Sequence, residues 1–135
     1  MNVSQLAFVL LLSFVAVSGV SGAVPLEKDV IIRNDLGGGR VLGLHCVSAD
    51  DDLGFRVLPP NEEWDFRFRT SFFLNTLFHC GFVWAGSQRQ SFAVYDDRKY
   101  HGVCTQCLWS IQTNGTCLIS SSITQVDCYP WAPAW

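Results

Sequence analysis

Short apolar stretches with a period of two residues, separated by turn residues, run through most of this chain. The window 64–69, WDFRFR, alternates strictly, so a strand there would place aromatic rings on one face and charges on the other. No window of helical length has a convincing apolar stripe with a period of 3.6 residues. The pattern therefore predicts an all-β protein.

The alternating stretches delimit about eight short strands. A hairpin is expected where residues 30–34 run into the three glycines 37–39 and residues 40–47 return. A second hairpin is expected at Asn114-Gly115, a dipeptide typical of tight hairpin turns. The other expected strands cover residues 55–58, 64–69, 78–84, 91–95, 103–112, 117–123 and a segment with Val126 and Cys128, with a polar connection at 96–102.

Strands of this length at near-regular spacing favour a small, disulfide-stapled antiparallel β-sandwich, with a β-barrel as the alternative. Each large apolar side chain buried in such a core contributes roughly 1.5–3 kcal/mol. Between the two sheets we expect Phe66, Phe68, Phe78, Phe82, Trp84, Phe92, Trp109 and Ile111. These aromatic side chains are interpreted as core and not as a platform for a ligand.

The N-terminus differs from the rest of the chain. Residues 6–17 form an almost unbroken apolar run that is too short to span a bilayer comfortably, and small residues follow it. We interpret residues 1–22 as a secretory signal peptide, with cleavage after Gly22 or Ala23, and residues 23–135 as one domain. A membrane anchor is the alternative, and the missing positive flank argues against it. The mature protein is expected to be extracellular.

The formal net charge is -3, and acidic and basic residues are interspersed along the mature part of the chain. Nucleic acids and anionic membranes attract basic patches, so this balance argues against both as partners. Stable membrane insertion of the mature chain is not expected either, because no second apolar run is long enough.

Six cysteines in a small exported domain indicate a disulfide framework, although six cysteines allow 15 pairings. On one continuous strand Cys104 and Cys107 would point to opposite faces with α-carbons roughly 10 Å apart, too far for a disulfide unless the backbone bends. Cys117 and Cys128 flank a segment that could fold back as a hairpin, so the hypothesis is a Cys117–Cys128 disulfide, with Cys46 and Cys80 bound to Cys104 and Cys107 in some order. A Cys117–Cys128 link would stabilise the fold by roughly 3 kcal/mol.

Several patterns suggest chemistry but are better explained by structure. The Cys-x-x-Cys spacing of Cys104 and Cys107 would need a helix N-terminus for redox catalysis, and the surrounding pattern indicates a strand. Zinc ligation is not indicated by the spacing of His45, His79 and His101. No catalytic residues, cofactor or metal ligands are therefore predicted, and we expect a protein that is not an enzyme.

Two surface motifs remain. The acidic run Asp50-Asp51-Asp52 before Gly54 lacks the spaced ligands of an EF-hand, so a solvated turn is favoured over a calcium site. Asn114 begins an Asn-x-Thr sequon in the predicted hairpin turn, which makes it a candidate for N-glycosylation in an exported protein. The same residue could serve the turn alone.

The order of these motifs over nearly the whole mature chain resembles the plant self-incompatibility protein family, the S-protein homologues. The segments that carry the resemblance are Val30-x-Ile32-x-Asn34, His45-Cys46-x-Ser48-x-Asp50-Asp51-Asp52-Leu53-Gly54, Trp64-x-Phe66-x-Phe68, Thr76-Leu77-Phe78-x-Cys80-x-Phe82-x-Trp84, Phe92-x-Val94-Tyr95, Cys104-x-x-Cys107-x-Trp109-x-Ile111, Gly115-x-Cys117 and Cys128-Tyr129-x-Trp131. The triple glycine before Arg40 and the tail 132–135 depart from the family pattern.

The resemblance implies a small extracellular β-sandwich that acts by being recognised and does not turn over a substrate. In the family's founding role such a protein is a stigma-secreted ligand of a pollen membrane receptor, and most relatives have no assigned role. We expect a monomeric ligand of a cell-surface receptor. The 86–90 and 96–102 loops, which we expect to be exposed and polar, are the candidates for specificity. A secreted defence or toxin-like protein, and less so a secreted hydrolase, are the alternatives.

Overall fold

The computed structural model describes residues 27–70, 75–120 and 126–132. The predicted signal peptide, 1–22, and the end of the predicted strand 117–123 lie outside these residues. No helix in the described ranges is both long and apolar enough to cross a membrane.

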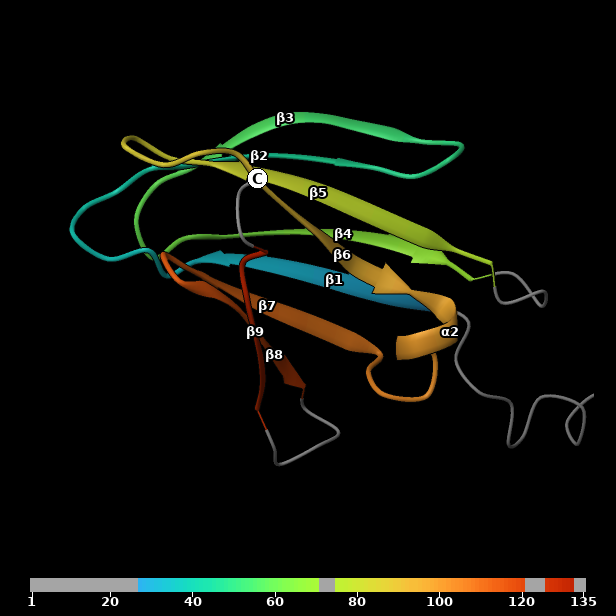
Figure 1. The fold of residues 1–135 in the computed structure, drawn as a ribbon. Helices are drawn as coiled ribbons and strands as arrows, with labels where there is room; N and C mark the ends of the chain where they lie inside the picture. Colours follow the sequence, from blue (N-terminus) through green and yellow to red (C-terminus); the bar gives the residue numbers. More distant parts are fainter. Residues whose placement is uncertain (1–26, 71–74, 121–125, 133–135) are drawn as a thin grey trace, which may run out of the picture.

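Nine described strands form two stacked sheets (Figure 1). The five-stranded sheet has the order β4 (Glu63–Arg69), β1 (Glu27–Asn34), β7 (Gln106–Gln112), β8 (Gly115–Ser120) and β9 (Asp127–Pro130). The four-stranded sheet has the order β3 (Asp52–Leu58), β2 (Leu42–Val47), β5 (Leu77–Val83) and β6 (Gln90–Asp96). The predicted all-β sandwich is confirmed.

One strand pair corrects the prediction of a purely antiparallel fold. Strand β1 runs antiparallel to β4 but parallel to β7, so that Val30 lies opposite Phe66 on one side and Cys107 on the other. The other strand pairs of the described residues are antiparallel. The five-stranded sheet is therefore mixed.

The hairpin predicted for residues 30–47 is wrong. Both edges of β1 are occupied, by β4 and β7, and β2 lies in the other sheet. The glycines 37–39, all with positive φ, belong to a connection that crosses between the sheets. The buried Asn34 side chain holds this connection, because its Nδ2 donates to the carbonyls of Arg40 (2.9 Å) and Leu58 (3.0 Å).

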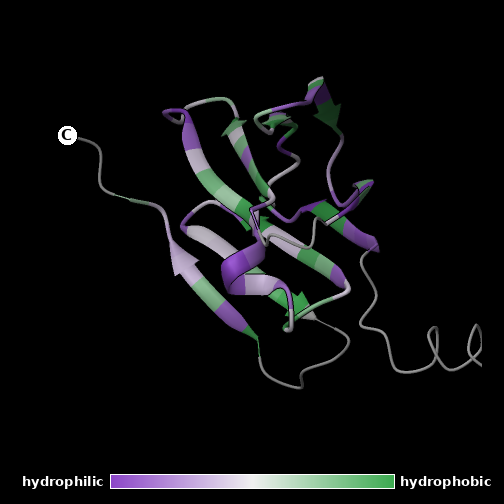
Figure 2. Ribbon diagram, turned by 90° about the vertical axis from the view of Figure 1, so that its right-hand side faces the viewer, coloured by the Kyte–Doolittle hydropathy of each residue, from purple (hydrophilic) through white to green (hydrophobic). Residues whose placement is uncertain are grey.

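The core follows the predicted alternation, which is visible as bands along the strands in Figure 2. Of the eight predicted core residues, six are buried, while Phe68 and Phe92 are partly buried and pack against them. Phe66, Phe68 and Phe78 form one aromatic group between the sheets. Trp109 is fully buried, and its Nε1 donates to the Val94 carbonyl of the opposite sheet at 2.7 Å.

The three disulfides are Cys46–Cys80, Cys104–Cys107 and Cys117–Cys128. The predicted Cys117–Cys128 pair is present, and it joins directly opposed residues of β8 and β9. Cys46 and Cys80 likewise lie opposite each other on β2 and β5.

The prediction that Cys46 and Cys80 bind Cys104 and Cys107 is wrong because residues 103–105 are not part of a strand. The N–H groups of Val103 and Cys104 both donate to the Tyr100 carbonyl, which turns the chain before β7 begins at Gln106. This bend brings the α-carbons of Cys104 and Cys107 to 5.3 Å. The disulfide therefore closes a turn and does not join the two sheets.

Candidate functional site

The acidic run after β2 forms a hydrogen-bonded turn. Asp51 N–H donates to Ser48 Oγ at 3.0 Å, and Ser48 N–H donates to the Asp51 carbonyl at 2.8 Å. Asp52 accepts from Gly54 N–H at 2.9 Å, and Gly54 has a φ of 77°. The preference for glycine at this position thus has a backbone cause.

Asp52 also connects this turn to β2. Its Oδ1 lies 2.6 Å from Nε2 of His45, whose side chain projects from the outer face of the four-stranded sheet. The hydrogen bond to His45, followed by that from Gly54 N–H, lowers the pKa of Asp52 below its usual value. The signature residues His45, Asp52 and Gly54 are therefore joined by hydrogen bonds next to this turn. Asp50, Asp51 and Asp52 are all exposed.

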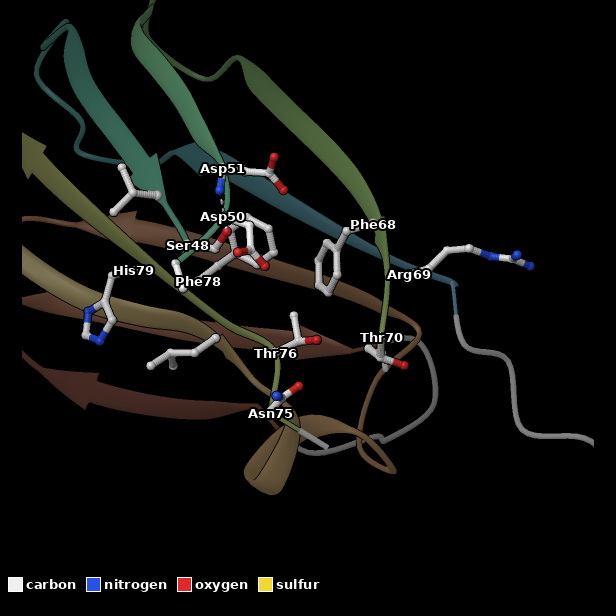
Figure 3. A pocket seen from close by; sticks show the side chains of 13 residues that line it. Ser48, Asp50, Asp51, Phe68, Arg69, Thr70, Asn75, Thr76, Phe78 and His79 are labelled. Carbon is white, nitrogen blue, oxygen red and sulfur yellow. Dashed lines mark hydrogen bonds between the residues drawn. The ribbon is translucent and has the colours of Figure 1, made fainter. Parts of the chain in front are cut away.

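A pocket of about 560 Å³ lies beside this turn, at the end of the sandwich (Figure 3). Phe68 and Phe78, whose ring centroids are 4.7 Å apart, form part of its apolar wall. Ser48, Asp50 and Asp51 also line the pocket. Nowhere in the described ranges do three or more His, Cys, Asp or Glu side chains gather closely enough to hold a metal ion. The pocket thus offers a mixed apolar and acidic surface.

The 86–90 loop, predicted to be exposed, connects β5 and β6 at one end of the sandwich (Figure 1). Gly86, Gln88 and Arg89 are exposed, and the turn is held by hydrogen bonds between Ser87 and Trp84. Ser87 therefore supports the turn, and Gln88 and Arg89 are its accessible side chains.

The 96–102 connection was predicted to be exposed and polar, and this is only partly correct. It contains the short helix α2 (Asp97–Tyr100), in which Asp97 and Tyr100 are buried. Asp96 caps the helix by accepting from Arg98 N–H, and Arg98 and Lys99 face solvent. Since β6 runs from the 86–90 loop to α2, the two candidate loops lie at opposite ends of the sandwich (Figure 1). They do not form one compact recognition site.

A buried polar cluster, missed in the sequence analysis, fixes α2 to the five-stranded sheet. Lys28 Nζ donates to the carbonyls of His101 (2.7 Å) and Cys104 (3.1 Å), and Lys28 is almost fully buried. Asp97 Oδ1 accepts from Tyr95 Oη at 2.7 Å. Burial lowers the pKa of Lys28, partly opposed by the nearby Asp97 charge. The signal was present in the sequence, because Lys28 shares the alternation phase of the buried Val30 and Ile32.

Asn114 lies in the predicted hairpin between β7 and β8, and its side chain is exposed. N-glycosylation there stays a prediction. Gly115 is needed for a reason other than turn geometry, since its φ is not positive. A Cβ at this position would lie 2.3 Å from the Tyr129 carbonyl oxygen of β9. Only glycine allows β9 to approach β8 this closely.

Comparison with known proteins identifies relatives of this chain. The model of the family "Plant self-incompatibility protein S1" matches residues 29–131. S-protein homolog 3 of Arabidopsis thaliana is 47% identical over 110 residues, which cover 78% of this chain and 73% of that protein. S-protein homolog 2 of the same plant is 40% identical over 121 residues, covering 84% of this chain and 74% of the relative.

A solved structure shares the fold. It is that of self-incompatibility protein homologues (SPH), described as a widespread family of small, highly stable, secreted proteins from plants. Its TM-score is 0.55 at 20% identity, with 80% of this chain and 91% of that chain covered. That description of the family agrees with the extracellular localisation predicted from the sequence.

Proposed function

Because the chain belongs to the plant self-incompatibility protein S1 family, we propose that it is a secreted signalling ligand perceived by a receptor on a cell surface. The signal peptide proposed for residues 1–22 would export it, and the oxidising compartment would allow its three disulfides to form. The alternatives are a defence protein that acts directly on microbes and a hydrolase.

The observation that carries the proposal is a disulfide-linked scaffold that presents short exposed loops. Two disulfides join opposed residues of neighbouring strands, and the third closes the turn before β7. The 86–90 loop and α2 extend from the two ends of β6. Recognition residues are typically found on such loops held by a rigid scaffold. The mature protein can therefore be recognised without a change in its fold.

The test uses the oxidised, purified mature protein, labelled at its N-terminus, and membrane fractions of the plant that makes it. Saturable, competable binding to a protease-sensitive membrane component is the expected result. Non-saturable binding, leakage of lipid vesicles or turnover of a substrate would instead support one of the alternatives and contradict the ligand role.

A matched pair of variants tests the loop assignment. Gln88→Ala changes an exposed glutamine of the 86–90 loop, and Gln106→Ala changes an exposed glutamine at the start of β7. Arg98→Ala tests the exposed side of α2. We expect weaker membrane binding for Gln88→Ala or Arg98→Ala and unchanged binding for Gln106→Ala. Equal binding by all three, with unchanged unfolding midpoints, would mean that neither loop contacts the receptor.

A further inference from the structure

The outward surface of the four-stranded sheet carries several large apolar side chains that are exposed to solvent. On β3, Phe55 and Val57 are 62% and 59% exposed, and Val83 of β5 is 38% exposed. In the strand register, Val57 and Val83 lie on either side of Gly43, and Phe55 and Gly81 lie on either side of His45. The side chains therefore form two adjacent rows across the sheet.

Two central positions of this surface are glycines, and long side chains from neighbouring segments lie over them. A Cβ on Gly43 would be 2.8 Å from Cζ of Phe55, and one on Gly81 would be 2.5 Å from Nη2 of Arg89. The end of the Phe55 ring thus lies over Gly43, and the Arg89 guanidinium lies over Gly81. With Val83 they line a hollow of about 180 Å³. We call Phe55, Val57, Val83 and Arg89 the outer apolar face.

Arg89 adds a positive charge to the outer apolar face. The side chain is exposed, and it forms no ion pair with any residue in the described ranges. Asp52, which reaches the same face through His45, is already bonded to His45 and to Gly54 N–H. A cation beside apolar surface is complementary to a carboxylate flanked by apolar side chains, because the partly desolvated ion pair would be strengthened.

We propose that the outer apolar face binds an extended segment of the receptor's extracellular part, with an apolar side chain in the hollow and a carboxylate on Arg89. This inference rests on the proposed function, since it names the part of the ligand that the receptor contacts. It also joins the face to the 86–90 loop, because Arg89 belongs to both. A second copy of this chain is the other occupant that the tests below include.

The first test measures saturable binding of three variants to the membrane fraction. Arg89→Gln and Val57→Ser should each bind at least tenfold more weakly than the wild type. Val126→Ser, a change at an exposed valine outside the face, is the matched control and should bind like the wild type. If the wild type binds and both face variants equal it, the outer apolar face is not the contact, although the ligand role stands.

The second test examines the outer apolar face directly and does not depend on the membrane assay, so failure of the inference and failure of the ligand role are distinguishable. Amide signals of the oxidised mature protein are followed by NMR during titration with a blocked peptide. The peptide has leucine at positions 1, 3 and 7, glutamate at position 5 and serine elsewhere. We expect shifts at Phe55, Gly81 and Arg89, and at least tenfold weaker binding by Arg89→Gln or by a peptide with lysine at position 5.

Three results would overturn the inference: no shifts on the face, equal binding of the acidic and basic peptides, or equal binding by Arg89→Gln. Analytical sedimentation tests whether a second copy of the chain occupies the face instead. If the wild type dimerises and Val57→Ser abolishes the dimer, the face binds a second copy of the chain. Gly43→Ala adds a positional check, because its Cβ would displace Phe55 and should weaken peptide binding without removing any apolar group.

Discussion

Lys28→Met tests the buried cluster that holds α2 against the five-stranded sheet. The substitution keeps an unbranched side chain but removes the donor to the carbonyls of His101 and Cys104. Each buried carbonyl left without a donor costs about 1–3 kcal/mol. Asp97 would also lose the nearby positive charge, and its Oδ2 has no hydrogen-bond partner among the described residues. The ammonium's own desolvation cost disappears, so we expect a net loss of about 2–4 kcal/mol.

The assay is urea unfolding of the oxidised mature protein at pH 7, followed by tryptophan fluorescence. Lys99→Met is the control, because Lys99 is exposed and stacks on the rings of Tyr100 and Tyr129. Loss of that stacking should cost about 1 kcal/mol or less. If Lys28→Met and Lys99→Met unfold at the same urea concentration, the cluster does not support the fold as argued.

The pH dependence of the same variant gives an independent measurement. The pKa of Lys28 is lower in the folded protein than its unfolded value of 10.5. As the pH approaches 10.5, the unfolded state therefore holds more protons than the folded state. The free energy of unfolding of the wild type should therefore increase relative to that of Lys28→Met over this range. A difference that stays constant with pH would contradict the burial of the charged group.

Two further predictions concern stability. Burial and the hydrogen bond to the Asp97 carboxylate raise the pKa of Tyr95, so the tyrosine ionises at a lower pH in the unfolded state than in the folded state. The free energy of unfolding of the wild type should therefore fall as the pH rises above 10. Tyr95→Phe should make this fall less steep in alkaline unfolding curves, and an equally steep fall would contradict the assignment. In the chain-entropy model, replacing Cys46–Cys80 by serines should cost about 4 kcal/mol and replacing Cys104–Cys107 about 2 kcal/mol, and thermal unfolding that ranks them in the reverse order would refute the model here.

The alternation pattern was sufficient to predict the sandwich and most of its core. Each predicted core position is set by the phase of a single strand, which is local information, and six of the eight side chains are buried. The hairpin at Asn114 was predictable for the same reason, since both strands adjoin one turn. The local alternation also places Lys28 among the buried positions of β1. Its burial was not predicted because a charged side chain is usually exposed.

One error concerns strand partners that are distant in the sequence, and another concerns a local bend of the backbone. The glycines 37–39 suit a tight turn, but nothing local to them reveals that β1 is already paired with β4 and β7. The disulfide error arose from the bend over residues 103–105 before β7, which changed the α-carbon distance between Cys104 and Cys107 from the roughly 10 Å of a strand to 5.3 Å. The outer apolar face was missed because alternation predicts exposure but does not give the strand register across the sheet.

The placement of β1 has a consequence for the timing of folding. The four-stranded sheet can assemble from residues 42–96, and Cys46 and Cys80 already lie opposite each other within it. Strand β1 is the first described strand along the chain, yet its parallel partner β7 is synthesised after that whole sheet. Pairing over such a sequence distance slows folding. We therefore expect the five-stranded sheet to form last, after translocation of most of the chain. Until then β1 would lack its parallel partner β7.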